Sequence, residues 1–217
     1  MKKIKFLAIL LFIFPFSSCS RVANFEVNET IWNDTFEKWD VNNASLTMVQ
    51  EAFVKQEVVV KAENKMKAYY KLVANDELFL EEYVYAQGDK YYNSLMVSGA
   101  KKYQRTEISK EEFNEIFNNN PISNIFASDI VDYFHLKDNY ASFTYDESKK
   151  TYNGIVKIPS DYLVDSFFDA LITVRFADEK LSFLEIAYED KDNRETLTFK
   201  DIGKTTIKIP TNYVDTK

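Results

Sequence analysis

The sequence has one cysteine and one histidine among its 217 residues. A single cysteine excludes a disulfide within the chain, and the two counts together exclude a zinc site built from several cysteine and histidine ligands. They also leave little scope for a nucleophilic Cys-His pair. Few of the residue types on which metal and covalent chemistry most often depends are therefore present.

Catalytic motifs are absent as well. The sequence contains no Gly-x-Ser-x-Gly, no phosphate-binding loop and no His-Glu-x-x-His. His135 stands between Phe134 and Leu136, and a histidine with such neighbours is typically structural. We expect a protein without enzymatic activity, cofactor or metal. A carboxylate-based cell-wall hydrolase is the remaining catalytic alternative, because 34 acidic residues could supply two acids to a cleft.

The first 18 residues have the features of a secretory signal peptide. Lys2, Lys3 and Lys5 form a basic region, and residues 6–16 are an apolar run of eleven. That run is too short to cross a bilayer, which takes about 20 apolar residues as a helix. The next residues, Phe-Ser-Ser-Cys at 16–19, resemble a bacterial lipobox.

The resemblance to a lipobox implies cleavage just before Cys19, which becomes a diacylglyceryl cysteine carrying acyl chains such as palmitate. Each buried CH2 contributes about 0.8 kcal/mol, so two chains anchor a protein stably where one would not. We therefore expect an extracytoplasmic protein, lipid-anchored to the bacterial cell membrane. The alternative is an ordinary signal peptide followed by an unmodified cysteine.

The charge of the chain is acidic. The net charge is −7, and removing the signal peptide with its three lysines leaves 24 basic and 34 acidic residues, a net charge of −10. Such a domain is repelled by nucleic acid and by anionic lipid head groups. We expect no nucleic-acid partner, and we expect the acyl chains to provide the membrane attachment.

Hydrophobic periodicity predicts one mostly β domain. Trp32, Phe36 and Trp39 recur at helical spacing and predict a helix over residues 30–41. From residue 45 the period changes to two, and short turns separate six segments, which is typical of an antiparallel meander. The predicted strands contain residues 46–48, 57–60, 65–72, 78–86, 90–97 and 101–108.

The remainder of the chain mixes helices with further strands. Ser109 and Glu112 have the spacing of a capping box and predict a helix start. Gly154, inside a predicted strand, indicates a bulge or a close backbone approach. Further helices are predicted at 128–136 and 160–171, and strands at 140–145, 151–158, 172–176, 181–188, 195–199 and 205–209. The predicted division is a signal peptide at 1–18, a tether at 19–29, a single domain at 30–212 and a C-terminal tail at 213–217.

Alternation along the early strands defines a candidate ligand cavity. Apolar side chains share one face of these strands, and lysines line the other. Glu81 and Glu82, as strand neighbours, are expected on opposite faces. The cavity candidates are Leu46, Met48, Val58, Val60, Met66, Ala68, Tyr70 and Leu72. These side chains form either a dry core or an apolar pocket, because few short helices are available to cover so many strands.

The order of elements resembles the LolA-like superfamily, which includes lipoprotein carriers and LppX-type surface lipoproteins. The closing stretch, at 174–181, 198–203 and 207–210, resembles it most. The resemblance implies a strongly curved antiparallel sheet, an unclosed half-barrel of the mainly β (α+β) class with helices packed on its concave side. It also implies a non-catalytic protein that binds acyl chains or other apolar ligands there.

Two hypotheses from different functional classes follow. The first is a surface lipoprotein that binds a hydrophobic or lipid-like ligand as a carrier or sensor. The second is an envelope protein-protein interaction module with a filled core, using exposed tyrosines such as Tyr83, Tyr85 and Tyr92. Tyrosine is enriched at interfaces because its ring gives contact area and its hydroxyl a polar handle.

Overall fold

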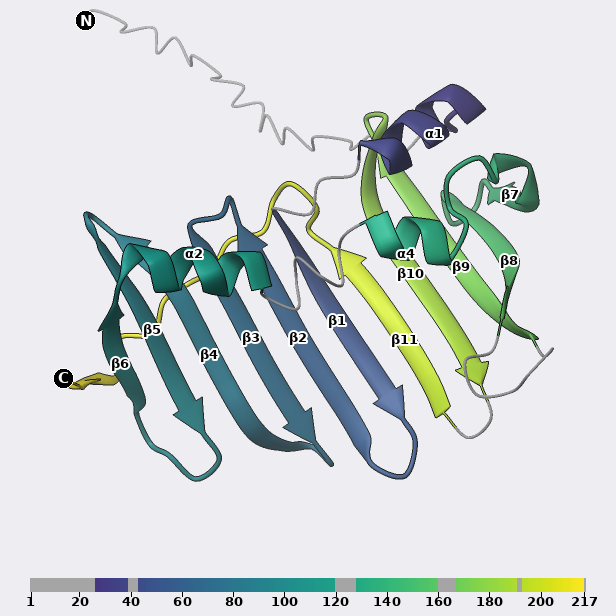
Figure 1. Ribbon diagram of the computed structural model, residues 1–217. Helices are drawn as coiled ribbons and strands as arrows, with labels where there is room; N and C mark the ends of the chain where they lie inside the picture. The colour runs from purple at the N-terminus through teal and green to yellow at the C-terminus, as the bar shows by residue number, and fades with distance from the viewer. Residues whose placement is uncertain (1–25, 39–42, 120–127, 160–166, 191–192, 217) are drawn as a thin grey trace, which may run out of the picture.

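A computed structural model describes residues 26–38, 43–119, 128–159, 167–190 and 193–216. In these residues twelve strands form one open sheet, with the order β12-β6-β5-β4-β3-β2-β1-β11-β10-β9-β8-β7 (Figure 1). The first and last strands in this order are not paired with each other, so the sheet is curved but not closed. The prediction of a mostly β, unclosed antiparallel architecture is confirmed. The signal peptide, Cys19 and the start of the tether lie outside the described residues.

Six consecutive strands make up one half of the sheet. Each is antiparallel to the next, which confirms the predicted meander. Asn64-Lys65 and Asn75-Asp76 have positive φ at both positions, as the tight turns that best match strand twist require. The strands are β1 (Asn43–Glu51), β2 (Lys55–Glu63), β3 (Lys67–Ala74), β4 (Glu77–Gln87), β5 (Lys90–Val97) and β6 (Tyr103–Ile108).

The other half of the sheet is built from the later part of the chain. It joins the meander through the antiparallel pair β1–β11, in which Met48 lies opposite Leu197. Its elements are the 3-10 helix η1 (Tyr140–Ser142) and the strands β7 (Phe143–Asp146), β8 (Thr151–Pro159), β9 (Phe167–Ala177), β10 (Lys180–Asp190) and β11 (Asn193–Lys200). The fourth predicted helix, at 160–171, is wrong where the structure describes it. Phe168 and Ala170 are buried and alternate with exposed neighbours, which is the period of a strand.

Helices α1 (Glu29–Glu37), α2 (Lys110–Asn119) and α4 (Ser128–Tyr133) lie over one face of the sheet, which we call the inner face (Figure 1). The Asn28 side chain caps α1 by accepting from the Ile31 amide. The predicted capping box is confirmed: Glu112 N donates to Ser109 Oγ at 3.1 Å, and Ser109 N donates to Glu112 Oε2 at 2.8 Å.

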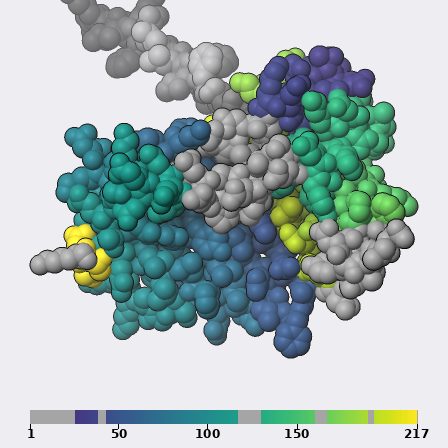
Figure 2. All heavy atoms as spheres, viewed as in Figure 1, coloured from purple at the N-terminus to yellow at the C-terminus, as the bar shows by residue number. Residues whose placement is uncertain are grey.

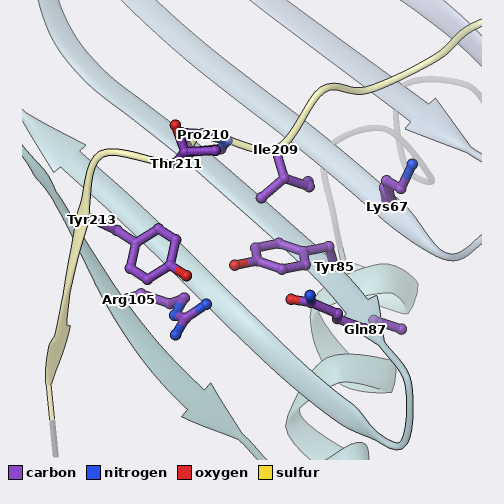
Figure 3. A pocket seen from close by; sticks show the side chains of 9 residues that line it. Lys67, Tyr85, Gln87, Arg105, Ile209, Pro210, Thr211 and Tyr213 are labelled. Atoms are coloured by element: carbon purple, nitrogen blue, oxygen red, sulfur yellow. The ribbon is translucent and has the colours of Figure 1, made fainter.

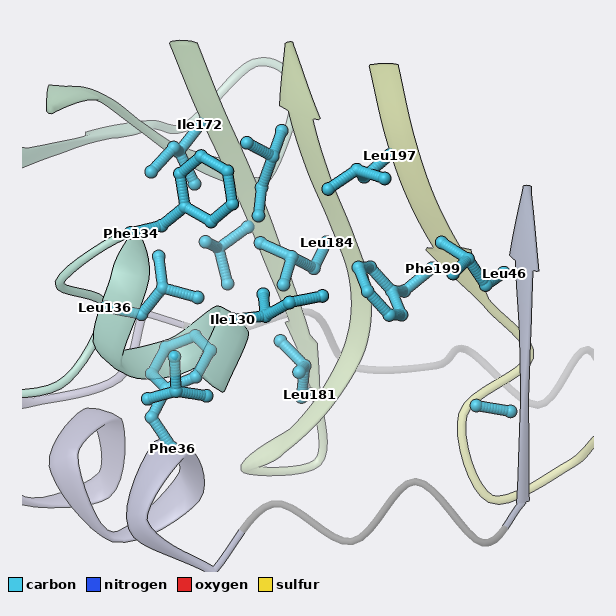
Figure 4. Close-up of a cluster of buried hydrophobic side chains, with 14 of the residues drawn as sticks. Phe36, Leu46, Ile130, Phe134, Leu136, Ile172, Leu181, Leu184, Leu197 and Phe199 are labelled. Atoms are coloured by element: carbon cyan, nitrogen blue, oxygen red, sulfur yellow. The ribbon is translucent and has the colours of Figure 1, made fainter. Parts of the chain in front are cut away.

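The hydrophobic core lies between the helices and the inner face (Figure 4). Trp32 of α1 is fully buried among aromatic rings, and its indole N–H donates to the Leu136 carbonyl at 2.7 Å. Val27, assigned from sequence to the tether, is 1% exposed, and its backbone N–H and C=O bond the Tyr152 hydroxyl. The folded domain therefore begins before residue 30.

The end of the chain crosses the opposite face of the sheet, which we call the outer face (Figure 1). Residues 205–209 do not form the predicted strand, because their polar groups bond side chains of β1 and β2: Thr205 N donates to Asn43 Oδ1, and Ile207 N to Glu63 Oε2. The predicted tail at 213–217 is corrected as well. Tyr213–Thr216 form β12, a short strand parallel to β6 at the edge of the sheet.

Candidate functional site

Five apolar side chains form a continuous row across the inner face. They are successive cross-strand partners on β1 to β5, namely Met48, Val58, Leu72, Leu80 and Val97. Neighbouring strands lie about 4.8 Å apart, so the row is about 19 Å long. That length is comparable to a long acyl chain. We call this set the apolar row.

The apolar row extends past the edge of the packed core. Met48 and Val58 pack against the core, whereas Leu72, Leu80 and Val97 are not part of the core that the described residues form. Val97 is 50% exposed, and the other four are partly exposed. Figure 2 shows the lower part of these strands uncovered beneath α2. Among the described residues, no helix packs over this end of the row.

The eight predicted cavity residues separate into three groups. Leu46, Val60 and Ala68 are buried in the core, so they correspond to the dry-core interpretation. Met48, Val58, Tyr70 and Leu72 are partly exposed on the inner face. Met66 lies in the turn between β2 and β3 and is 51% exposed.

Sequence reasoning missed two members of the row, Leu80 and Val97. A bulge between Leu72 and Val73 changes the register of β3 with β4, and Leu78, Phe79 and Leu80 are all apolar. Alternation alone therefore does not tell which of them faces inward.

A pair of polar residues, Glu82 on β4 and Asn93 on β5, borders the row. Glu82 faces inward two residues after Leu80, between its partners Tyr70 and Leu95. Asn93 donates from Nδ2 to Glu82 Oε1 at 2.7 Å, while its buried Oδ1 has no hydrogen-bond partner in the described part of the chain. Burial and the negative charge of Glu82 raise the pKa of the Tyr70 hydroxyl. As predicted, Glu81 points to the opposite face, toward the tyrosines described below.

A second acid lies beyond the β1 end of the row, on the neighbouring strand β11. Glu195 is two residues from Leu197, opposite Gln50 and Tyr188. Burial raises the pKa of this carboxyl, and a hydrogen bond from Tyr188 partly offsets the effect. The Tyr188 ring stacks on Phe168 with 4.9 Å between centroids, so the acid sits beside an aromatic pair.

Charge is divided unequally between the two faces. Away from the hairpin ends, the register places two charged residues on the inner face of the described strands, Glu82 and Glu195, and no lysine or arginine. The basic residues of the strands point outward, for example Lys61, Lys71 and Arg175. The inner face is therefore apolar with two acidic positions.

Tyrosines gather on the outer face around Glu81. Tyr69 and Tyr83 donate to its Oε1 at 2.9 and 3.1 Å, and Tyr103 donates to its Oε2 at 2.7 Å. Burial and this carboxylate raise the pKa values of all three phenols, that of Tyr83 to about 12. The three hydroxyls are thus already used within the fold.

The predicted surface of exposed tyrosines is not found. Tyr85 is 2% exposed, Tyr83 is partly buried in the Glu81 cluster, and Tyr92 is partly buried between the Tyr85 ring and the Arg105 guanidinium. Their rings face one another and neighbouring side chains, because adjacent strands place them opposite each other. These residues do not form the interaction surface that the sequence suggested.

A small pocket of about 280 Å³ lies under the C-terminal segment on the outer face (Figure 3). Arg105 stands beside it, with its guanidinium 3.7 Å from the Tyr213 ring centroid and its Nε 2.6 Å from Asp215 Oδ1. Lys67, on the other side, is bonded to Glu63 at 2.8 Å. Both cations are therefore already paired, and Arg105 serves to attach β12.

Two further findings concern chemistry and membranes. His135 is exposed, lies two residues after the end of α4 and has a positive φ of 48°. Within the described ranges, no three His, Cys, Asp or Glu side chains lie close enough to share a metal ion. None of the described helices is both long and apolar enough to span a bilayer.

Comparison with known proteins gives a structural likeness but no match in sequence. No family model matches the chain, and no curated protein matches it. Among solved structures, LprF from Mycobacterium bovis is similar over 86% of this chain and 97% of its own, with 10% sequence identity and a TM-score of 0.40. Membership of the LolA-like superfamily stays a prediction.

Proposed function

We propose that this protein is a lipid-anchored protein of the bacterial envelope that binds a hydrophobic or lipid-like ligand on the inner face of its sheet. It acts as a carrier or sensor and performs no catalysis. Cys19 carries the anchor, and the helix-covered face is the concave side of the sheet.

The observation that carries the proposal is the apolar row. Leu72, Leu80 and Val97 lie on the same face as the core yet outside it. A folded protein gains about 25 cal/mol for each Å² of apolar surface removed from water, so a row left partly exposed favours a ligand that covers it. Partly exposed apolar side chains arranged in a continuous line mark a binding surface more strongly than scattered ones do.

The test is native mass spectrometry of the chain from residue 20 onward, followed by organic extraction. All described elements lie within residues 26–216, so this chain retains the entire described fold. We expect a lipid-sized mass that is released on denaturation. An apo mass, together with no thermal shift from lipids added later, would contradict the proposal.

Matched variants locate the site. The double variant Leu72→Gln with Leu80→Gln places two amides in the row, and it should abolish lipid capture. The control is Val59→Gln with Val73→Gln, because these residues point outward from the neighbouring positions of β2 and β3. Equal loss of lipid in both variants would show that the effect comes from reduced stability.

A further inference from the structure

We propose that the inner face selects lipids whose head groups donate hydrogen bonds and carry no negative charge, and that it discriminates against lipids with carboxylate or phosphate heads. This inference rests on the proposed function and specifies the ligand class of the same site. It depends on the two acidic positions that border the apolar row.

Electrostatic repulsion disfavours an anionic head group beside the apolar row. Glu82 lies beside the β4 position of the row, and Glu195 lies on β11, the strand next to the β1 end of the row, so a head group at either end of the row lies near one of them. Away from the hairpin ends, the described strands place no lysine or arginine on the inner face to neutralise an anionic head. An anionic head group and the neighbouring glutamate carboxylate repel each other far more in a partly desolvated site than they do in water.

Hydrogen bonding favours a head group that donates. Asn93 gives its amide N–H to Glu82, and its buried Oδ1 lacks a partner within the described residues. Glu82 and Glu195, when ionised, can only accept hydrogen bonds. A buried acceptor without a donor is costly, so a hydroxyl or amine head offers the missing donor where a carboxylate offers none.

The two faces of the sheet also differ in the side chains that they offer to a lipid. Lysines and arginines of the strands lie on the outer face, several of them in ion pairs such as Lys67–Glu63 and Lys90–Glu107. The basic side chains of the described strands, away from the hairpin ends, are available to an anionic head only on that face, which lacks the apolar row. Apolar chains are therefore expected to bind on the inner face, and anions are expected to bind the strand cations on the outer face.

The experiment compares three probes that share one chain: oleyl alcohol, oleylamine and oleate. Delipidated protein from residue 20 onward is titrated with each at pH 7.5, and displacement of a neutral fluorescent lipid is measured. We expect the alcohol and the amine to bind at least about tenfold more tightly than oleate, a difference of about 1.4 kcal/mol. Comparable binding of oleate and the alcohol would overturn the inference while leaving the proposed function standing.

Variants decide whether the two acids cause the selection. The double variant Glu82→Gln with Glu195→Gln should bring oleate to within about threefold of the alcohol. Glu57→Gln removes one acid from the outer face of β2 and should leave the ratio unchanged. A ratio that stays the same in the double variant would also overturn the inference. If none of the three probes binds, the proposed function fails together with it.

Discussion

Glu195 is a partly buried acid whose charged form disfavours folding. It is an acid beside the Tyr188–Phe168 pair, and burial raises its pKa. The folded state then binds its proton more tightly than the unfolded chain does. The contribution of Glu195 to the free energy of unfolding is therefore highest below the unfolded pKa of 4.5 and falls as the pH rises through the folded value.

This gives a pH-dependent prediction for Glu195→Gln. The amide is uncharged at every pH and still accepts a hydrogen bond from Tyr188. We expect the variant to melt at a higher temperature than the unmodified protein at pH 7, and at the same temperature at pH 4. Scanning calorimetry at the two pH values checks it, and an equal increase at both would contradict burial of the charge as the cause.

The Glu81 cluster gives a second prediction at the scale of single residues. Three phenols donate to one carboxylate, and glutamine offers only one acceptor oxygen. We expect Glu81→Gln to lower the free energy of unfolding by about 1–3 kcal/mol, because at least one buried hydroxyl loses its acceptor. Urea unfolding measures it. The control Glu107→Gln, on the same face and bonded to Lys90, should have little effect.

At the scale of elements, local signals predicted well what depends on local physics. The β1–β6 meander follows from alternation and turn residues, and the start of α2 follows from Ser109 and Glu112. The helix expected at 160–171 was wrong after residue 166, because the apolar spacing of Phe167 and Leu171 also fits a strand with those residues exposed. Periodicity in a short segment does not distinguish these cases.

The close backbone approach predicted at Gly154 is confirmed. A Cβ on this residue would lie 2.7 Å from Phe143 Cδ1 and 3.0 Å from the Ser142 carbonyl oxygen. We expect Gly154→Ala to destabilise the protein by about 1–3 kcal/mol, because β7 and η1 would have to move. Lys157→Ala, at an exposed position of the same strand, is the control in the same thermal unfolding assay.

The last strand was not predictable, because four residues in parallel pairing leave no periodic signal. Its attachment depends on Arg105, which contacts the Asp215 carboxylate and the Tyr213 ring. Lysine cannot reproduce the planar stack, so Arg105→Lys should increase amide exchange of residues 213–216 by at least about tenfold. Arg194→Lys, in an exposed hairpin pair with Glu189, should leave that exchange unchanged. Equal protection in both variants would contradict the role of Arg105.

At the scale of the whole molecule, the candidate site could be predicted only in part. Alternation placed Met48, Val58 and Leu72 on one face, and the structure agrees. Whether a residue of that face is buried or partly exposed depends on where helices from distant parts of the chain pack. The roles of Glu82 and Glu195 required the register of the complete sheet, which pairs residues far apart in sequence.

The pairing of β1 with β11 also has a consequence for the order of folding. Every other antiparallel pair in the sheet joins neighbours in sequence, whereas β1–β11 brings residues 43–51 to residues 193–200. Closing so long a loop costs chain entropy before its contacts form, so this step should be the slow one. In refolding followed by pulsed hydrogen exchange, we expect amides of β3 and β4 to gain protection before those shared by β1 and β11. The two halves would then form first as separate meanders, and Glu195 would take its place beside the apolar row of β1 to β5 only when they join.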